Sequence, residues 1–115
     1  MPRRRVPDPL AEAVGRRIRM LREEQGLTME KLAYESEFSK GHLSSLERGL
    51  VMPTVATLQL LADRLGVLVA DLVTDPSSGP RAELLEASRH APIGAVRRAV
   101  RELRARRPKP VTDSS

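Results

Sequence analysis

The sequence predicts an all-α protein, with about five short helices followed by additional C-terminal helices. Three observations predict this class. Apolar residues recur at spacings of three and four, which place them on one face of a helix. No stretch alternates apolar and polar residues as a half-buried strand does, and the chain leaves no room for parallel-strand crossovers. Gly26, Gly49 and Gly66 follow the periodic stretches, where helices commonly end.

The composition favours one compact domain with tails in a chain of 115 residues. Aromatic residues make up 2%, so aliphatic side chains must fill the core. The chain contains no Cys, which excludes a disulfide framework, a thiolate metal site and a cysteine nucleophile. The basic N-terminus is not followed by an apolar segment, and no stretch approaches the roughly 20 apolar residues of a membrane span. We therefore expect a soluble, cytoplasmic protein.

The net charge of +5 is distributed unevenly along the chain. Residues 10–75 carry eight Lys and Arg against ten Asp and Glu, whereas residues 95–115 carry seven against two. Residues 1–9 contain three Arg and one Asp. Basic ends of this kind favour a polyanion such as nucleic acid, although they also serve solubility.

The first expected helix begins at Asp8 and Pro9 and ends near Gly26. Its expected inward stripe has spacings of four, four and three residues and consists of Leu10, Val14, Ile18 and Leu21. A second short helix follows at residues 29–35, with Thr28 as its N-terminal cap.

The second and third expected helices form the most informative part of the chain. Ser39 caps the third helix, which follows the second after a turn of a few residues. Two short helices so joined, with a small residue where they cross, are typical of a helix-turn-helix motif. Ala33 is that small residue, and Leu43 and Leu46 anchor the third helix to the core. Its other side chains are expected to face outward or sideways.

Two more helices complete the expected domain, and a C-terminal extension follows it. Residues 55–65 carry an apolar stripe, and a short turn of helix closes the domain near Thr74. The predicted division is a basic flexible arm at 1–9, the domain at 10–75, a linker at 76–80, a helical extension at 81–107 and a disordered tail at 108–115.

The segments "LTMEKLAYESEFSKGHLSSLERG" and "PTVATLQLLADRLGV" resemble the lambda-repressor-like, Cro-type helix-turn-helix regulators, also called the XRE family. The resemblance covers about Leu10 to Val73. It implies a five-helix, sequence-specific regulator of transcription that binds double-stranded DNA, more often as a repressor. It also implies that the third helix, Ser39 to Arg48, enters the major groove. Relatives typically dimerise on palindromic operators with half-sites about 34 Å apart.

The resemblance also implies a set of DNA-binding residues. Lys40 and His42 are expected to contact base edges or phosphate, Ser45 to contact a base edge, and Gly41 to permit a close approach. Ser44 and Arg48 are expected to serve the DNA backbone. The full expected set is Thr28, Ser39, Lys40, Gly41, His42, Ser44, Ser45 and Arg48. A further implied feature is a structural salt bridge between Arg22 and Glu47.

Two positions depart from the family pattern. The family often has Gly in the turn where this chain has Glu37, and a left-handed conformation costs a non-glycine residue roughly 1 kcal/mol. Glu37 has the wrong charge for a neighbour of phosphate, so we expect it to face away from DNA. Met29 occupies a position where the family often has a polar phosphate contact.

The sequence favours no enzymatic chemistry. Its two His residues, His42 and His90, do not have metal-ligand spacing. We find no Gly-rich phosphate loop and no grouping of nucleophile, base and acid. We therefore expect no catalytic residue, no metal site and no cofactor.

Several alternatives stay open at this stage. The protein is either a DNA-binding regulator, an antitoxin or adaptor whose main partner is another protein, or a pure interaction module. Residues 81–107 either dimerise, bind DNA or bind a partner or antagonist protein. Arg3, Arg4 and Arg5 either form an arm that reaches the minor groove or add non-specific attraction. We expect three leucines at the surface, Leu50, Leu60 and Leu68. They form a dimer interface, dock the C-terminal helices or are isolated surface leucines.

Overall fold

The computed structural model describes residues 6–107, and all its regular elements are helices. They are α1 (Pro9–Glu24), α2 (Met29–Glu35), α3 (Lys40–Glu47), α4 (Val55–Leu65), α5 (Val69–Val73), a 3-10 turn (Pro76–Ser78), α6 (Pro80–His90) and α7 (Ile93–Ala105). Between residues 6 and 107 there is no strand, and the predicted all-α class is confirmed. The candidate arm residues Arg3, Arg4 and Arg5 and the tail at 108–115 lie outside the described residues.

Hydroxyl caps begin three of the short helices. The side-chain oxygens of Thr28, Ser39 and Thr54 each accept a hydrogen bond from the backbone N–H three residues further on, at 3.0–3.1 Å. Such a cap satisfies one of the N–H groups that have no partner inside the helix. The starts of α2 and α3 are therefore defined by local sequence, which is why both were predictable.

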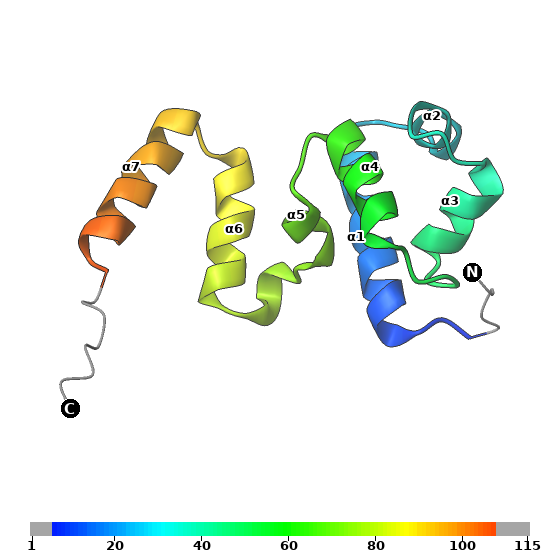
Figure 1. The fold of residues 1–115 in the computed structure, drawn as a ribbon, viewed down its shortest axis with the longest axis horizontal. Coiled ribbons are helices and arrows are strands. Elements are labelled where there is room, and N and C mark those ends of the chain that lie inside the picture. The colour runs from blue at the N-terminus through cyan, green and yellow to red at the C-terminus, as the bar shows by residue number, and fades with distance from the viewer. Residues whose placement is uncertain (1–5, 108–115) are drawn as a thin grey trace.

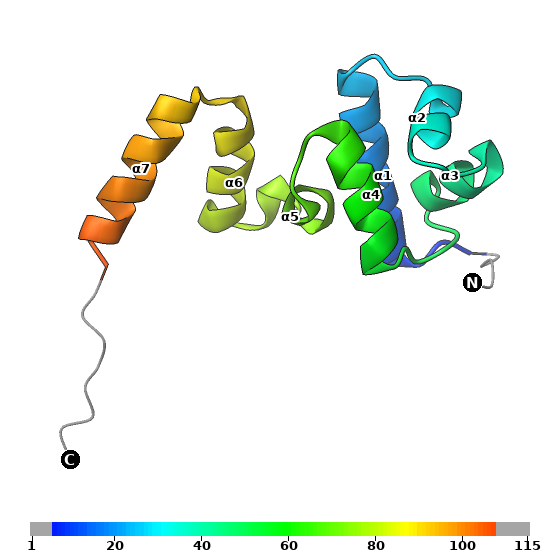
Figure 2. The ribbon, with the colours of Figure 1, turned by 45° about the horizontal axis from the view of Figure 1, so that its top comes forward.

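Helices α1 to α5 surround one aliphatic core (Figure 1). Its fully buried large side chains are Ile18, Leu21, Leu32, Leu43, Leu46, Leu61 and Leu72. Ala33 is also buried and belongs to this cluster. After a turn of 45°, α2 and α3 still lie together at one end of the molecule, beside α1 and α4 (Figure 2). The core thus holds α3 from one side and leaves its other side open.

Two predicted positions are wrong. Leu10 was expected in the core but is 61% exposed, because the stripe of α1 continues with a spacing of three to Ala11, which is 0% exposed. Leu50 was expected at the surface but is 7% exposed. Its N–H donates to the carbonyl of Ser45 at 2.9 Å, across Gly49 at φ 74°. This six-to-one bond turns the chain back over the helix end and places Leu50 in the core.

Helix α6 contacts the domain through charged side chains. Arg17 on α1 donates to the backbone carbonyl of Asp71 at 2.7 Å and pairs with Glu86 on α6. Arg89 on α6 pairs with Glu86 at 2.9 Å and with Glu24 of α1 at 3.2 Å. The arginines beside Glu86, with Arg89 contributing most, lower the pKa of that carboxyl from 4.5 to about 2. The charge of Glu86 therefore stabilises the docked α6.

Acid is expected to loosen α6 before it unfolds the core. Because the folded-state pKa of Glu86 is depressed, its contribution is present above about pH 4.5 and is lost as the pH falls toward 2. Amide hydrogen exchange in α6 should therefore accelerate relative to α4 between pH 5 and pH 3, after correction for intrinsic rates. A Glu86→Gln variant should show weaker protection of α6 at pH 6 and a smaller further loss in acid. Protection of α6 that does not change between pH 5 and pH 3 would contradict this account.

Helix α7 differs from the others because none of its residues is buried. Among residues 93–107, the six arginines face a single acidic residue, Glu102, which pairs with Arg106 at 3.0 Å. Figure 1 and Figure 2 both show α7 at the end of the molecule opposite α3, along a longest dimension of 55 Å. The arginines of α7 therefore do not lie on the surface that α3 presents.

Candidate nucleic-acid interface

The first turn of α3 presents exposed polar residues on one side and buried leucines on the other. Lys40, Gly41 and His42 are exposed, whereas Leu43 and Leu46 are 0% and 1% exposed. Arg48, at the end of the helix, is also exposed, and Ser44 is half-buried. The structure thus places most of the predicted contact residues on an open surface, around a helix whose roll is set by its two leucines.

Gly41 has no packing role inside the protein. A Cβ atom built on it would find no other atom within 4 Å. A glycine inside a helix lowers stability by about 0.5–1 kcal/mol relative to alanine. Since no neighbour in the described chain requires its small size, Gly41 leaves the outer surface of α3 free for a close approach from outside.

Lys40 pairs with an acidic residue of the preceding helix. Its Nζ lies 2.7 Å from Oε1 of Glu30, and both side chains are more than half exposed. The Lys40 ammonium, as the main cause, lowers the pKa of the Glu30 carboxyl. Sequence reasoning missed Glu30, because the nine residues between the two partners give no signal of their contact.

His42 contacts the turn that precedes α3. Its ring centroid lies 5.3 Å from that of Phe38, with the planes tilted by 52°. Phe38 is half-buried and packs against the core. The contact restricts the orientations of the His42 ring, which remains exposed at the start of α3. No group of three or more His, Cys, Asp or Glu residues between residues 6 and 107 could hold a metal ion.

The expectation that Ser45 faces outward is wrong. Ser45 is 6% exposed, whereas Ser44 beside it is half-buried. Around the helix, residue 45 lies about 100° from Leu46 and about 160° from Leu43, so the side that the two leucines bury does not account for the burial of Ser45.

A buried ion pair holds the C-terminal end of α3 on α1. Arg22 donates to Glu47 twice, from Nε to Oε2 at 2.8 Å and from Nη2 to Oε1 at 3.1 Å. Its Nη1 donates to the carbonyl of Leu27 at 2.7 Å. The hydrogen bonds with Glu47 raise the pKa of Arg22. The pair expected from the resemblance is therefore present, and it also links α3 to the turn that leads into α2.

The backbones of α1 and α3 approach closely at two glycines that the sequence reasoning did not single out for this role. A Cβ atom on Gly15 would lie 2.3 Å from the carbonyl oxygen of Leu46. One on Gly49 would lie 2.5 Å from Cα of Glu12. The available signal was a glycine inside an otherwise regular helical pattern, which often marks a close approach.

Glu37 adopts the left-handed conformation that its place in the turn predicted. Its φ angle is 62°, and it is the non-glycine residue with positive φ in the described chain. Its side chain is exposed. The turn between α2 and α3 therefore has the helix-turn-helix geometry without the glycine that the family often uses.

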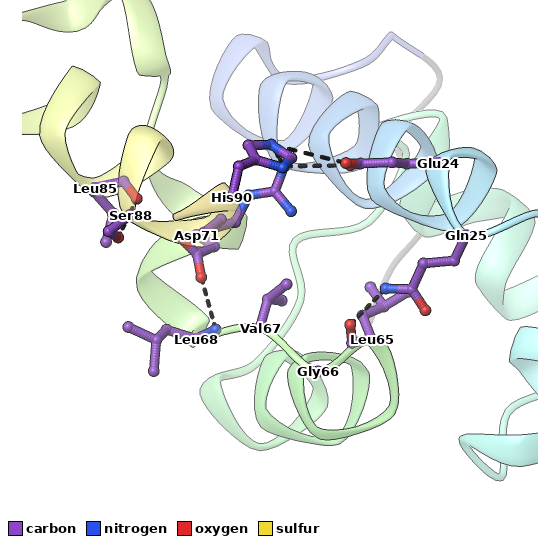
Figure 3. A pocket seen from close by; sticks show the side chains of 11 residues that line it. Glu24, Gln25, Leu65, Gly66, Val67, Leu68, Asp71, Leu85, Ser88 and His90 are labelled. Atoms are coloured by element: carbon purple, nitrogen blue, oxygen red, sulfur yellow. Dashed lines mark hydrogen bonds and ion pairs between the residues drawn. The ribbon is translucent and has the colours of Figure 1, made fainter. Parts of the chain in front are cut away.

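A cavity of about 550 Å³ lies away from this surface. It opens between the C-terminal end of α1, the connection from α4 to α5, and α6 (Figure 3). Its lining includes Gln25, Leu65, Asp71 and His90, and no residue of α2 or α3. It is therefore separate from the candidate nucleic-acid interface.

The arrangement matches a known family and known proteins. The helix-turn-helix domain family matches residues 13–74, more than half of the chain. This chain belongs to that family. It is 46% identical over 71 residues to the uncharacterised HTH-type transcriptional regulator y4dJ of Sinorhizobium fredii, covering 62% of this chain and 92% of that protein. It is 37% identical over 60 residues to the immunity repressor protein of Bacillus phage phi105, covering 52% of this chain and 42% of that protein.

Solved structures support the same assignment. The N-terminal DNA-binding domain of SinR from Bacillus subtilis superposes with a TM-score of 0.54 and 31% identity, covering 58% of this chain and 99% of that one. SinR in complex with DNA gives a TM-score of 0.50 and 35% identity, over 51% and 95% of the two chains. The resemblance to lambda-repressor-like regulators is confirmed. The protein is a helix-turn-helix regulator of a DNA-binding, non-enzymatic class.

One further finding concerns membranes. Among the helices between residues 6 and 107, none is both long and apolar enough to cross a bilayer.

Proposed function

We propose that this protein is a sequence-specific, double-stranded DNA-binding repressor of transcription that acts as a homodimer in the cytoplasm. In this proposal α3 enters the major groove, with Lys40 and His42 at base edges. Ser39, Ser44, Arg48 and the cap Thr28 serve the DNA backbone. Ser45 is left out because it is buried.

The observation that carries the proposal is that one side of α3 is held by the core and by an ion pair, whereas its other side is exposed to solvent. The buried pair of Arg22 and Glu47 and the leucines beneath hold the helix in one position. Its outer surface carries a lysine, a histidine and a glycine on which an added Cβ atom would meet no other part of the protein within 4 Å. Recognition of base edges needs such a rigid helix with adaptable polar groups on its open side.

The proposed repressor role is supported by similar proteins, and the proposed dimer is supported by the small size of the domain. The similar phage protein is an immunity repressor, and one similar structure was solved in complex with DNA. A single domain of this size makes few base contacts, so we expect two protomers on a palindromic operator with half-sites about 34 Å apart. Leu60 and Leu68, which are 45% and 62% exposed, remain candidates for the dimer interface.

The position of α7 bears on the predicted partners. Because α7 lies at the end of the molecule opposite α3, we place residues 81–107 outside the DNA interface of their own protomer. A second protomer or a partner protein is then the proposed use of that extension. The antitoxin or adaptor alternative finds no support among the similar proteins.

A bulky residue at Gly41 tests the proposal without disturbing the fold. In a Gly41→Leu variant, the added Cβ atom meets no other part of the protein within 4 Å and leucine favours helix more than glycine does, so the melting temperature should be equal to or higher than that of the wild type. Affinity for a duplex selected from a random pool by the wild-type chain should fall by at least about tenfold, since the side chain occupies the space that the groove needs.

The matched control is Ala13→Leu, at an exposed position of α1 that lies outside α3 and outside residues 81–107. That variant should bind the selected duplex like the wild type. Equal binding by both variants, or a wild-type chain that selects no sequence and instead forms its tightest complex with another protein, would contradict the proposed function.

A further inference from the structure

The ion pair of Lys40 and Glu30 joins the two helices of the motif at the ends that face the proposed groove. Glu30 lies in the first turn of α2 and Lys40 in the first turn of α3, with 2.7 Å between Nζ and Oε1. Their side chains are 63% and 62% exposed. A pair exposed to this degree contributes little to stability. The pair is therefore more important for the position of the Lys40 ammonium than for the stability of the fold.

This pair differs from other exposed pairs of the domain. Arg16 with Glu12, Arg19 with Glu23 and Lys31 with Glu35 each join residues four apart on one helix. Such pairs are common on solvated helix surfaces. Lys40 and Glu30 instead join α3 to α2, so the pair sets the direction of the lysine relative to both helices.

The chemistry of the two groups suits discrimination between bases and phosphates. A lysine ammonium has three N–H donors, so two remain when one is given to Glu30. Guanine offers two acceptors, O6 and N7, at its major-groove edge. A phosphate attracts the same ammonium, but the Glu30 carboxylate repels a phosphate that approaches this corner.

We propose that Glu30 is a specificity-determining residue that acts through Lys40. This inference rests on the proposed function, because it requires α3 to enter the groove. At a matched site Lys40 donates to the base edge and keeps its contact with Glu30. On unmatched DNA it has to leave Glu30 for a phosphate, and the uncovered carboxylate then faces the phosphates. Glu30 thereby lowers affinity for unmatched DNA more than for the matched sequence.

The test uses Glu30→Gln, which keeps the shape of the side chain and removes its charge. Dissociation constants are measured for a duplex selected by the wild-type chain and for a scrambled duplex of the same composition, at one salt concentration. The variant should bind the scrambled duplex about five- to tenfold more tightly and the selected duplex within about twofold of wild type. The specificity ratio is the dissociation constant for the scrambled duplex divided by that for the selected duplex, and it should fall about five- to tenfold. This is at the low end of the discrimination that one bidentate base contact provides.

Two further variants separate this mechanism from simple charge removal. Glu83→Gln removes the same charge from an exposed position on α6, and should raise both affinities by the same small factor. In a Lys40→Met background, Glu30→Gln should no longer change the specificity ratio. Circular dichroism checks that each variant retains the helical fold.

The outcomes are distinguishable. An unchanged ratio in Glu30→Gln, equal effects of Glu30→Gln and Glu83→Gln, or a change of ratio that persists in the Lys40→Met background would each overturn the inference. A wild-type chain that shows no preference for any duplex would instead overturn the proposed function on which it rests.

Discussion

Replacing Glu47 by alanine is expected to lower the free energy of unfolding by about 3–5 kcal/mol, the usual cost of breaking a buried pair by removing one partner. Arg22 and Glu47 are 8% and 6% exposed and share two hydrogen bonds. Without the carboxylate, the Arg22 guanidinium stays buried and keeps its hydrogen bond to the carbonyl of Leu27 and a longer ion pair, 3.8 Å, with Glu23. Urea unfolding followed by circular dichroism measures the change.

A matched control is Glu12→Ala, which removes an exposed partner of Arg16 on the same domain. That pair has a similar length, 2.7 Å, but its side chains are 66% and 42% exposed. Its loss should cost only about 0–1 kcal/mol because water replaces the lost contact. Stabilities of Glu47→Ala and Glu12→Ala that agree within about 1 kcal/mol would show that the buried pair has no special structural role.

A double variant sharpens the interpretation. Replacing Arg22 by methionine and Glu47 by leucine together leaves no unpaired charge, and such exchanges of a buried pair are often neutral. The double variant should therefore be more stable than Glu47→Ala. The double variant keeps side chains packed at both positions but removes both charges. A lower affinity for DNA than that of the wild type would therefore show that the charges help to position α3.

The second large effect is expected at Gly15. In a Gly15→Ala variant, the new Cβ atom would lie 2.3 Å from the carbonyl oxygen of Leu46 and 2.6 Å from that of Glu47. The partners are backbone atoms of α3, so the two helices have to move apart. We expect a net loss of about 1–3 kcal/mol in the free energy of unfolding, even after the roughly 1 kcal/mol that alanine gains over glycine in an isolated helix.

The same substitution at Gly94 is the control for helix propensity. There the nearest atom to an added Cβ is the end of the Arg98 side chain at 3.9 Å, so Gly94→Ala should be neutral or slightly stabilising. A Gly15→Ala variant that melts at or above the wild-type temperature would contradict the close approach of α1 and α3. Because α3 shifts in this variant, its DNA affinity should also fall.

Features that depend on local sequence were predictable. Thr28 and Ser39 cap their helices by accepting a hydrogen bond from the backbone N–H three residues further on. Such a bond involves only neighbouring residues, so the local sequence is enough to predict it. The apolar periodicity identified Leu43 and Leu46 as the inner side of α3, and both are buried. The resemblance to the family supplied the long-range pair of Arg22 and Glu47, which spacing alone does not reveal.

Other features required the packing of α1 against α3. Periodicity tolerates a shift of one residue at the end of a stripe, which is why Leu10 was misplaced and Ala11 takes its position in the core. The burial of Ser45 does not follow from its spacing along α3 and depends on the packing of the surrounding elements. The contact of Glu30 with Lys40 depends on the turn geometry around Glu37, since that turn directs one helix relative to the other.

Residue order alone specified an all-helical chain, the starts of its short helices and a polar third helix of the helix-turn-helix kind. These follow from periodicity and capping, whose physical range is a few residues. Which side chains α3 leaves open, and where α6 and α7 lie, depends on contacts between residues tens of positions apart. Arg17 pairs with Glu86 and Arg22 with Glu47 across such separations, and only the close packing of the helices brings these charges together.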